Sequence, residues 1–137
     1  MAYIKYKELT GYFNFSKKVE IEQLPNEILP YFTDDEKILV AYSTGVVSGR
    51  DLFVLTSKKI MVVDNKGFLL KKKTVHFFPF STISSSAIEF KNRQVAILLS
   101  MDSGYQVRLN FVNLSNVEQN NIQKMYMTMI ESIEKVD

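Results

Sequence analysis

The single histidine and a group of serines are the side chains whose types could support catalysis. His76 stands between Val75 and Phe77, and no carboxylates are spaced to converge on it as metal ligands. The serines follow closely, at Ser81, Ser84, Ser85 and Ser86. None of them lies in the Gly-x-Ser-x-Gly frame that exposes a nucleophile. We therefore expect His76 to be packed or hydrogen-bonded and the serines to lie on a polar strand. We predict no catalytic residue, no metal site and no cofactor.

One concentration of positive charge could bind an anionic surface. It consists of Lys66, Lys71, Lys72 and Lys73. Near a charged membrane each lysine could contribute about 1 kcal/mol of binding free energy. The same lysines could instead be a solvated hairpin end that protects an exposed strand from aggregation. We favour the second interpretation and keep membrane contact as the alternative.

The composition excludes several classes of function. The chain has 137 residues, 46% of them hydrophobic, and 17 basic against 15 acidic residues give a net charge of +2. That charge is too small to indicate nucleic-acid binding. The absence of cysteine excludes disulfides, thiolate catalysis and cysteine-ligated metals. Charges interrupt the N-terminal residues, and no apolar run approaches the ~18 residues of a membrane span. We expect a cytoplasmic protein.

The elements that must position these residues are mostly strands. Short apolar runs separated by turn residues predict seven of them, at residues 38–44, 51–56, 59–64, 74–80, 83–90, 94–101 and 105–112. Seven short strands at such spacing favour an antiparallel meander that closes into a barrel or sandwich. Before the strands, residues 3–13 have a loosely helical apolar spacing, and Pro25 suits the start of a short helix carrying Ile28 and Leu29.

A long amphipathic helix is predicted after the strands. Ser115 and Glu118 have the spacing of a capping box at its start. The apolar residues recur at intervals of three and four, at Ile122, Tyr126, Met129, Ile133 and Val136. This apolar stripe must pack on something apolar, most simply the open end of the barrel.

The predicted hairpin at residues 51–64 is apolar on both faces, although a hairpin with one wet face should alternate. One face carries Phe53, Leu55, Ile60 and Val62, and the other carries Leu52, Val54, Met61 and Val63. The strand around Ile97 and Leu99 is also apolar on both faces. Residues 1–33 could cover the second face through their aromatic side chains, or a second subunit could cover it, and both can hold if the segment is exchanged between subunits. The subunit interface would then contain Leu52, Val54, Met61, Val63, Ile97 and Leu99.

Several short motifs, in their order and spacing, resemble those of bacterial pleckstrin-homology-like (PH-like) domains. An acidic segment, Glu36-Lys37-Ile38, precedes the first predicted strand. Thr56-Ser57-Lys58-Lys59 occupies the hairpin turn, with Lys59 where this group usually has arginine. Asp64 to Gly67 match a second turn, and Phe78-Pro79-Phe80-Ser81-Thr82-Ile83 match a third segment. The resemblance covers residues 34–135.

The resemblance implies a mainly β fold, namely a seven-stranded antiparallel PH-like barrel or sandwich capped by the C-terminal helix. It also implies no catalysis and a tendency to form homo-oligomers. We therefore predict a PH-like domain at residues 34–137. Residues 1–33 do not share the resemblance, and we predict them to be a partly helical N-terminal extension. The basic phosphoinositide-reading motif of eukaryotic relatives is missing from residues 45–50. We therefore expect a non-enzymatic module that binds itself or another protein. The alternative is a peripheral module for anionic membranes.

Overall fold

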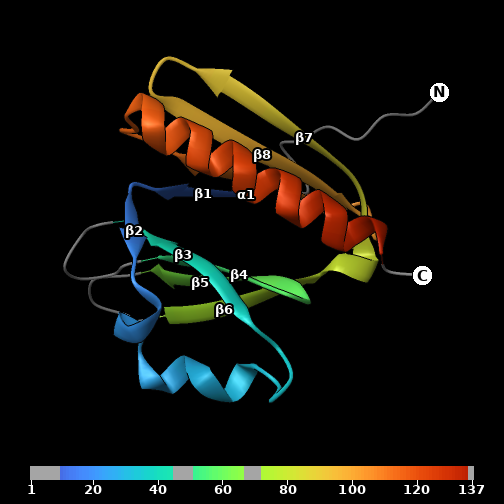
Figure 1. The fold of residues 1–137 in the computed structure, drawn as a ribbon. Coiled ribbons are helices and arrows are strands. Elements are labelled where there is room, and N and C mark those ends of the chain that lie inside the picture. The colour runs from blue at the N-terminus through green and yellow to red at the C-terminus, as the bar shows by residue number, and fades with distance from the viewer. Residues whose placement is uncertain (1–9, 45–50, 67–71, 136–137) are drawn as a thin grey trace. The chain divides into compact units, whose positions relative to one another are not determined.

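The computed structural model describes residues 10–44, 51–66 and 72–135, which divide into two compact units. The meander unit contains the described residues from 15 to 79. The helix unit contains residues 10–14 and 80–135. Figure 1 shows the strands and helices of both units.

The meander unit is built on a five-stranded antiparallel sheet. The order across the sheet is β2-β3-β4-β5-β6. The strands are β2 (Lys17–Val19), β3 (Ile38–Ser43), β4 (Leu52–Thr56), β5 (Lys59–Lys66) and β6 (Lys72–Pro79). Two short 3-10 helices lie between β2 and β3, η1 (Ile21–Gln23) and η2 (Asn26–Tyr31), and Pro25 caps the second. Proline suits this position because it has no amide hydrogen to leave unpaired.

The β4–β5 hairpin is buried on both faces. Opposite residues in its register include Leu52 with Val63 and Val54 with Met61. The side chains of this face are at most 8% exposed, and those of the other face (Phe53, Leu55, Ile60 and Val62) are at most 1% exposed. On that second face Phe53 also packs against Phe15, with ring centroids 5.6 Å apart. Because both faces of this strand pair are buried, its residues do not need to alternate between apolar and polar.

The helix unit contains a four-stranded sheet in the order β1-β9-β8-β7, with one long helix. Its elements are β1 (Thr10–Phe15), η3 (Phe80–Thr82), β7 (Ile83–Lys91), β8 (Gln94–Met101), β9 (Gln106–Phe111) and α1 (Asn116–Glu134). In β9, Val107, Leu109 and Phe111 are fully buried. Asn110 is also buried, and its side-chain amide donates to the carbonyl of Phe13 in β1 (3.2 Å).

Helix α1 begins with the predicted capping box and lies on β7, β8 and η3. The Glu118 amide donates to Ser115 Oγ (3.2 Å), and the Ser115 amide donates to Glu118 Oε1 (2.8 Å). The hydrogen bonds from Ser115 hold the pKa of Glu118 below its usual range. On the packed side Ile122, Met125 and Met129 are buried. Tyr126 joins the sheet through a hydrogen bond between its hydroxyl and Ser86 Oγ (2.9 Å).

We expect Met129→Ala to lower the free energy of unfolding by about 2–4 kcal/mol, because it empties a core position. Met129 is 1% exposed, whereas Met127 on the same helix is 51% exposed. Met127→Ala is therefore the matched control and should change the stability little. Urea denaturation of both variants measures the difference. Equal midpoints for the two variants would show that the stripe does not pack on the sheet.

The predicted fold class is confirmed, since the chain is mainly β and ends in an amphipathic helix. One detail was wrong, because nine strands rather than seven lie within the described residues. They form two separate sheets, which fits the sandwich alternative of the prediction rather than the barrel alternative. The additional strands, β1 and β2, lie between residues 10 and 19. The predicted helix at residues 3–13 lies partly outside the described residues, and its remaining part is strand β1. In the described ranges no helix is long and apolar enough to cross a membrane.

Candidate functional site

The face of the meander sheet that carries Leu52, Val54, Met61 and Val63 is covered by the short helices that precede β3. These four side chains form a core cluster with Leu24, Ile28 and Ala41. Val19, Phe32, Ile38 and Val75 pack at its margin. The cover therefore consists of aliphatic residues near η1 and η2, together with Phe32. Burial of each large side chain stabilises the fold by about 1.5–3 kcal/mol.

The other two residues of the predicted subunit interface lie in β8 of the helix unit. Ile97 and Leu99 are both 0% exposed. All six predicted interface side chains are thus buried within a single chain. An interface at these residues stays a prediction, and it would require that the covering segment be exchanged between subunits.

A small cavity lies where the covering segment meets one end of the meander sheet. Its volume is about 240 Å³. The lining is mixed: the apolar residues are Val19, Pro25, Ile28, Leu52 and Val63, the charged ones Glu27, Asp51 and Lys73, and the neutral polar ones Gln23, Ser43 and Asn65. Ligand sites commonly measure about 300–1,000 Å³, so this cavity could hold only a small molecule.

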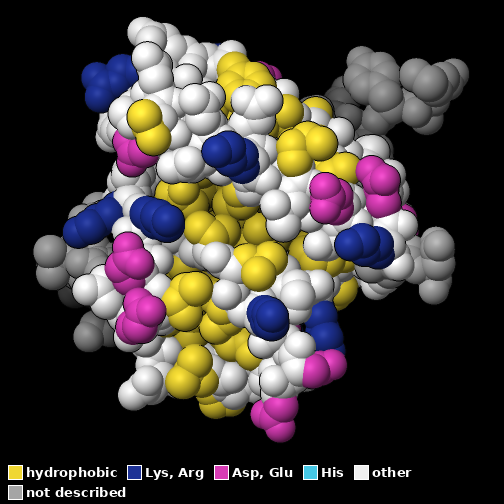
Figure 2. All heavy atoms as spheres, viewed as in Figure 1, with side chains coloured by type: hydrophobic (Ala, Val, Ile, Leu, Met, Phe, Trp, Pro, Cys, Tyr) yellow, Lys and Arg dark blue, Asp and Glu magenta, His cyan; other side chains and the backbone are white. Residues whose placement is uncertain are grey.

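The structure describes the predicted lysine cluster only in part. Lys71 lies outside the described residues, and of Lys66 only the backbone is described, opposite Lys72 in the β5–β6 register. Lys72 is exposed, and Lys73 lies 3.5 Å from the carboxylate of Glu27 in an exposed ion pair. On the face shown in Figure 2, basic and acidic side chains are interspersed. Lys73 therefore has an acidic neighbour, whose charge offsets part of its attraction to an anionic surface.

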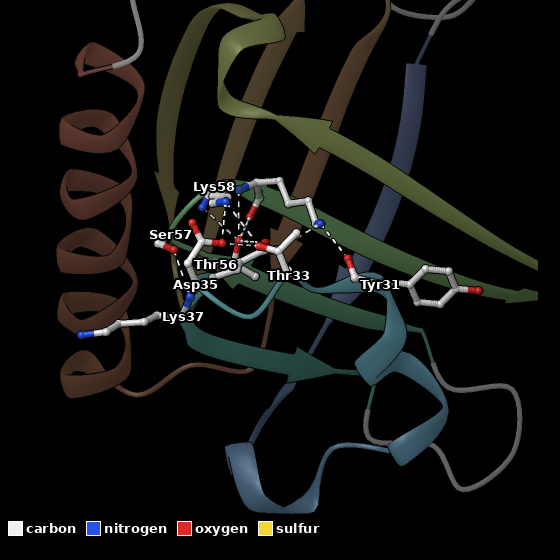
Figure 3. Close-up of polar contacts among 9 residues, drawn as sticks. Tyr31, Thr33, Asp35, Lys37, Thr56, Ser57 and Lys58 are labelled. Carbon is white, nitrogen blue, oxygen red and sulfur yellow. Dashed lines mark hydrogen bonds and ion pairs between the residues drawn. The ribbon is translucent and has the colours of Figure 1, made fainter.

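A polar network joins the β4–β5 turn to the segment between η2 and β3 (Figure 3). Its centre is the carboxylate of Glu36, whose side chain is 0% exposed. Thr56 Oγ1 donates to Glu36 Oε2, and the Thr33 amide donates to Glu36 Oε1 (3.1 Å). Lys59 Nζ is 3.3 Å from the same Oε1 atom. Burial raises the pKa of Glu36, but these hydrogen bonds and the charge of Lys59 outweigh it, so the pKa is lowered.

Lys59 ties three parts of the meander unit together. Its ammonium donates to the carbonyl of Tyr31 (2.8 Å) at the end of η2. It also lies over the rings of Phe32 and Phe77, 5.5 and 5.6 Å from their centroids, where cation–π attraction stabilises the charge. Its side chain is 16% exposed. Because these contacts join η2, the segment between η2 and β3, and β6 to Lys59 of β5, we assign the Glu36–Lys59 pair a structural role.

This network was not predicted from the sequence, although its residues lie in conspicuous motifs. Glu36, Thr56 and Lys59 belong to the motifs that carry the family resemblance. The signal in the sequence was that Glu36, before β3, and Lys59, after the β4–β5 turn, both lie in motifs of the family pattern. Nearby, Lys58 pairs with Asp35 (2.9 Å) on the surface. The hydrogen bond from Lys58 lowers the pKa of Asp35.

The candidate catalytic residues do not form a catalytic arrangement within the described residues. His76 is half-buried in β6 and stacks on Phe78, with centroids 6.2 Å apart. The hydroxyls of Ser84 and Ser86 contact the carbonyl of Ser100 and the hydroxyl of Tyr126. Ser81 and Ser85 are exposed. In residues 10–44, 51–66 and 72–135 no group of three potential metal ligands comes together.

Comparisons with known proteins agree with this architecture. The bacterial PH domain model matches residues 9–95, so the match begins within the segment that the sequence analysis assigned to an extension. A comparison with curated proteins finds no match. Among solved structures the chain is similar to a DUF1696 family protein with a pleckstrin-homology domain from Shewanella loihica PV-4. The identity is 25% and the TM-score 0.66, over 88% of this chain and 99% of that one. It is also similar to a pleckstrin homology domain from Shewanella amazonensis SB2B, at 25% identity and TM-score 0.55, over 80% and 87% of the two chains.

Proposed function

The chain belongs to the family of bacterial PH domains, and from that premise we propose that it is a non-enzymatic protein-interaction module that forms homo-oligomers. The polar groups that the structure brings together support a non-enzymatic role. Glu36, Thr56 and Lys59 form hydrogen bonds with one another and with the backbone, and these bonds hold elements of the meander unit together.

The observation that carries the interaction role is an exposed aromatic pair in the meander unit. Tyr31 of η2 and Phe77 of β6 lie with ring centroids 5.5 Å apart. They are 40% and 41% exposed. Large aromatic side chains bury much surface at little conformational cost, and they are enriched at protein interfaces. We therefore place the contact between copies at this pair.

Light scattering on the purified chain tests the proposal. We expect a mass of at least twice the 15.8 kDa of one chain. The double variant Tyr31→Glu with Phe77→Glu should reduce the mass to that of one chain without loss of the folded circular-dichroism spectrum. Leu39→Glu is the matched control, because Leu39 is 40% exposed in the same unit. A wild-type chain of monomeric mass would contradict the homo-oligomer.

Sedimentation with anionic vesicles tests the membrane alternative. We expect no association of the wild type at physiological salt, because screening acts strongly on exposed charges. Robust co-sedimentation that is abolished by Lys71→Glu with Lys73→Glu would favour the membrane role instead.

A further inference from the structure

Strand β7 forms an open edge of the helix-unit sheet. It is the last strand in the order β1-β9-β8-β7, and its residues pair with β8 on one side only within the described part of the chain. Figure 1 shows β7 at the outer edge of this sheet, with α1 beside it. Every second backbone amide and carbonyl of such a strand points away from the sheet. These groups can bind another extended chain.

The edge carries few of the features that block strand pairing. Natural edges are commonly protected by lysines, prolines or bulges along the strand. In β7 the register shift lies at the beginning, between Ile83 and Ser85, and the only lysine is the last residue, Lys91. In the first part of the strand the exposed side chains Ser84, Ser85 and Ala87 are small. Glu89, which pairs with Arg108 (2.8 Å), and the exposed Phe90 lie nearer its end. An incoming backbone can therefore approach the first part of the strand closely.

Helix α1 provides an apolar side to this edge. It runs antiparallel to β7, because Tyr126 contacts Ser86 whereas the earlier residue Gln119 donates to the carbonyl of Lys91 (3.4 Å). Helical spacing places Ile130, four residues after Tyr126, on the same flank. Phe90, near the end of β7, is 51% exposed. Apolar side chains of an added strand would find partners there.

Charged side chains lie at both ends of this edge, where Lys91 has Glu89 nearby, itself bound by Arg108 (2.8 Å), and Glu134 is followed by the exposed Lys135. Lys91 is exposed at the C-terminal end of β7. Glu134, four residues beyond Ile130, is exposed at the end of α1 that contacts η3, just before β7 begins. An added antiparallel strand would start near Lys91 and finish near Glu134. Charge complementarity therefore favours a segment that begins with an acidic residue and ends with a basic one.

We propose that the β7 edge binds an extended segment of another protein as an additional antiparallel strand, acidic at its start, basic at its end, and apolar at the alternate positions that face α1. This rests on the proposed role as a protein-interaction module and names the kind of partner. Main-chain hydrogen bonds to β7 provide the affinity, and the helix flank and the two charged ends select sequence and direction.

Amide hydrogen exchange of the full chain tests the proposal. The probe is the blocked peptide Asp-Thr-Val-Thr-Val-Thr-Lys. We expect it to slow the exchange of alternate β7 amides by on the order of tenfold when saturating, because those amides gain hydrogen bonds. The same peptide with proline at its central position should give no protection. The peptide with its two charged ends exchanged should bind more weakly to the wild type and more tightly to the Lys91→Glu, Glu134→Lys double variant.

Each other outcome overturns a defined part of the proposal. If the probe leaves β7 exchange unchanged, the edge does not accept a strand. If alternate β7 amides are already protected in the free chain, increasingly with protein concentration, a second copy occupies the edge and the partner is not another protein. Light scattering on the same samples separates the two proposals. An oligomer whose β7 amides are not protected by the probe supports the homo-oligomer and contradicts strand binding at β7. A monomer whose β7 amides are protected by the probe supports strand binding and contradicts the homo-oligomer.

Discussion

Met61→Glu is expected to abolish the cooperative thermal transition of the chain. Met61 is 0% exposed and lies in the core cluster with Leu24 and Ile28. An unpaired carboxylate at this position would cost at least several kcal/mol, which is comparable to the roughly 5–15 kcal/mol that stabilises a typical domain. The measurement is a thermal melt followed by circular dichroism. Leu39→Glu, at an exposed position of the same sheet, should melt close to the wild type.

A different outcome would identify Met61 as an interface residue after all. If Met61→Glu stays folded but the assembly loses mass, the face is covered by a second subunit in solution. Ile28→Ala provides an independent check, since Ile28 is 1% exposed and comes from the covering segment. It should lower the free energy of unfolding by about 2–5 kcal/mol, as for other emptied core positions. No loss of stability would show that this segment does not cover the sheet.

Glu36→Ala is expected to lower the free energy of unfolding by about 3 kcal/mol, the lower end of the range for breaking a buried ion pair. The variant leaves Lys59 without its carboxylate partner, and it leaves the hydroxyl of Thr56 and the amide of Thr33 without an acceptor. We take the lower end because the Tyr31 carbonyl still accepts from Lys59. Urea denaturation at neutral pH measures the loss. Asp35→Asn is the control, because the Asp35–Lys58 pair is exposed and should contribute little.

The same carboxylate should make the stability depend on pH in the acidic range. The pKa of Glu36 in the folded chain lies below its ordinary value of 4.5. Its stabilising contribution is therefore fully present above pH 4.5 and is lost as the pH falls through the folded pKa. Glu36→Gln should reduce the loss of stability on acidification relative to the wild type. An identical acid dependence in both proteins would show that other carboxylates account for it.

The strands from β3 onward and helix α1 could be predicted because their signals are local. β9 alternates apolar and polar residues, and the capping box of Ser115 and Glu118 defines the start of α1. The turn between β7 and β8 contains Asn92, and the turn between β8 and β9 contains Asp102 and Gly104, which are typical turn residues. Such features depend on a few neighbouring residues, so the sequence alone displays them.

Strand β1 was missed although its pattern was present. Gly11, Phe13 and Phe15 are buried, while Tyr12 and Asn14 between them are exposed, which is the period of a strand with one wet face. The aromatic residues of segment 3–13 also have a helical spacing, and this spacing led to the prediction of a helix instead of a strand. β2 has only three residues and pairs with β3, so its existence depends on a partner far along the chain. Such pairing cannot be read from a local pattern.

The sequence of the β4–β5 hairpin indicated that the face with Leu52, Val54, Met61 and Val63 must be covered. It did not indicate which residues cover that face. The aromatic residues near the N-terminus were the obvious candidates. The residues that pack there are Leu24, Ile28, Val19 and Phe32, together with neighbours on the sheet. The side chains of Leu29 and Ile28 are adjacent in sequence, yet only Ile28 is buried. That choice depends on the direction in which a short 3-10 helix presents its side chains, which composition does not reveal.

The pairing of β1 with β9 has a consequence for synthesis of the chain on the ribosome. The contact between Phe13 and Asn110 joins residues 97 positions apart. At roughly 5–20 residues per second, β1 waits about 5–20 s for its partner strand to be made. During that interval Phe15 can already pack on Phe53 of the meander unit, but Phe13 has no partner strand beside it. The strands of the meander unit pair with near neighbours and can form in the meantime. We therefore expect nascent chains stalled before β9 to bind chaperones through β1, and completed chains to be released.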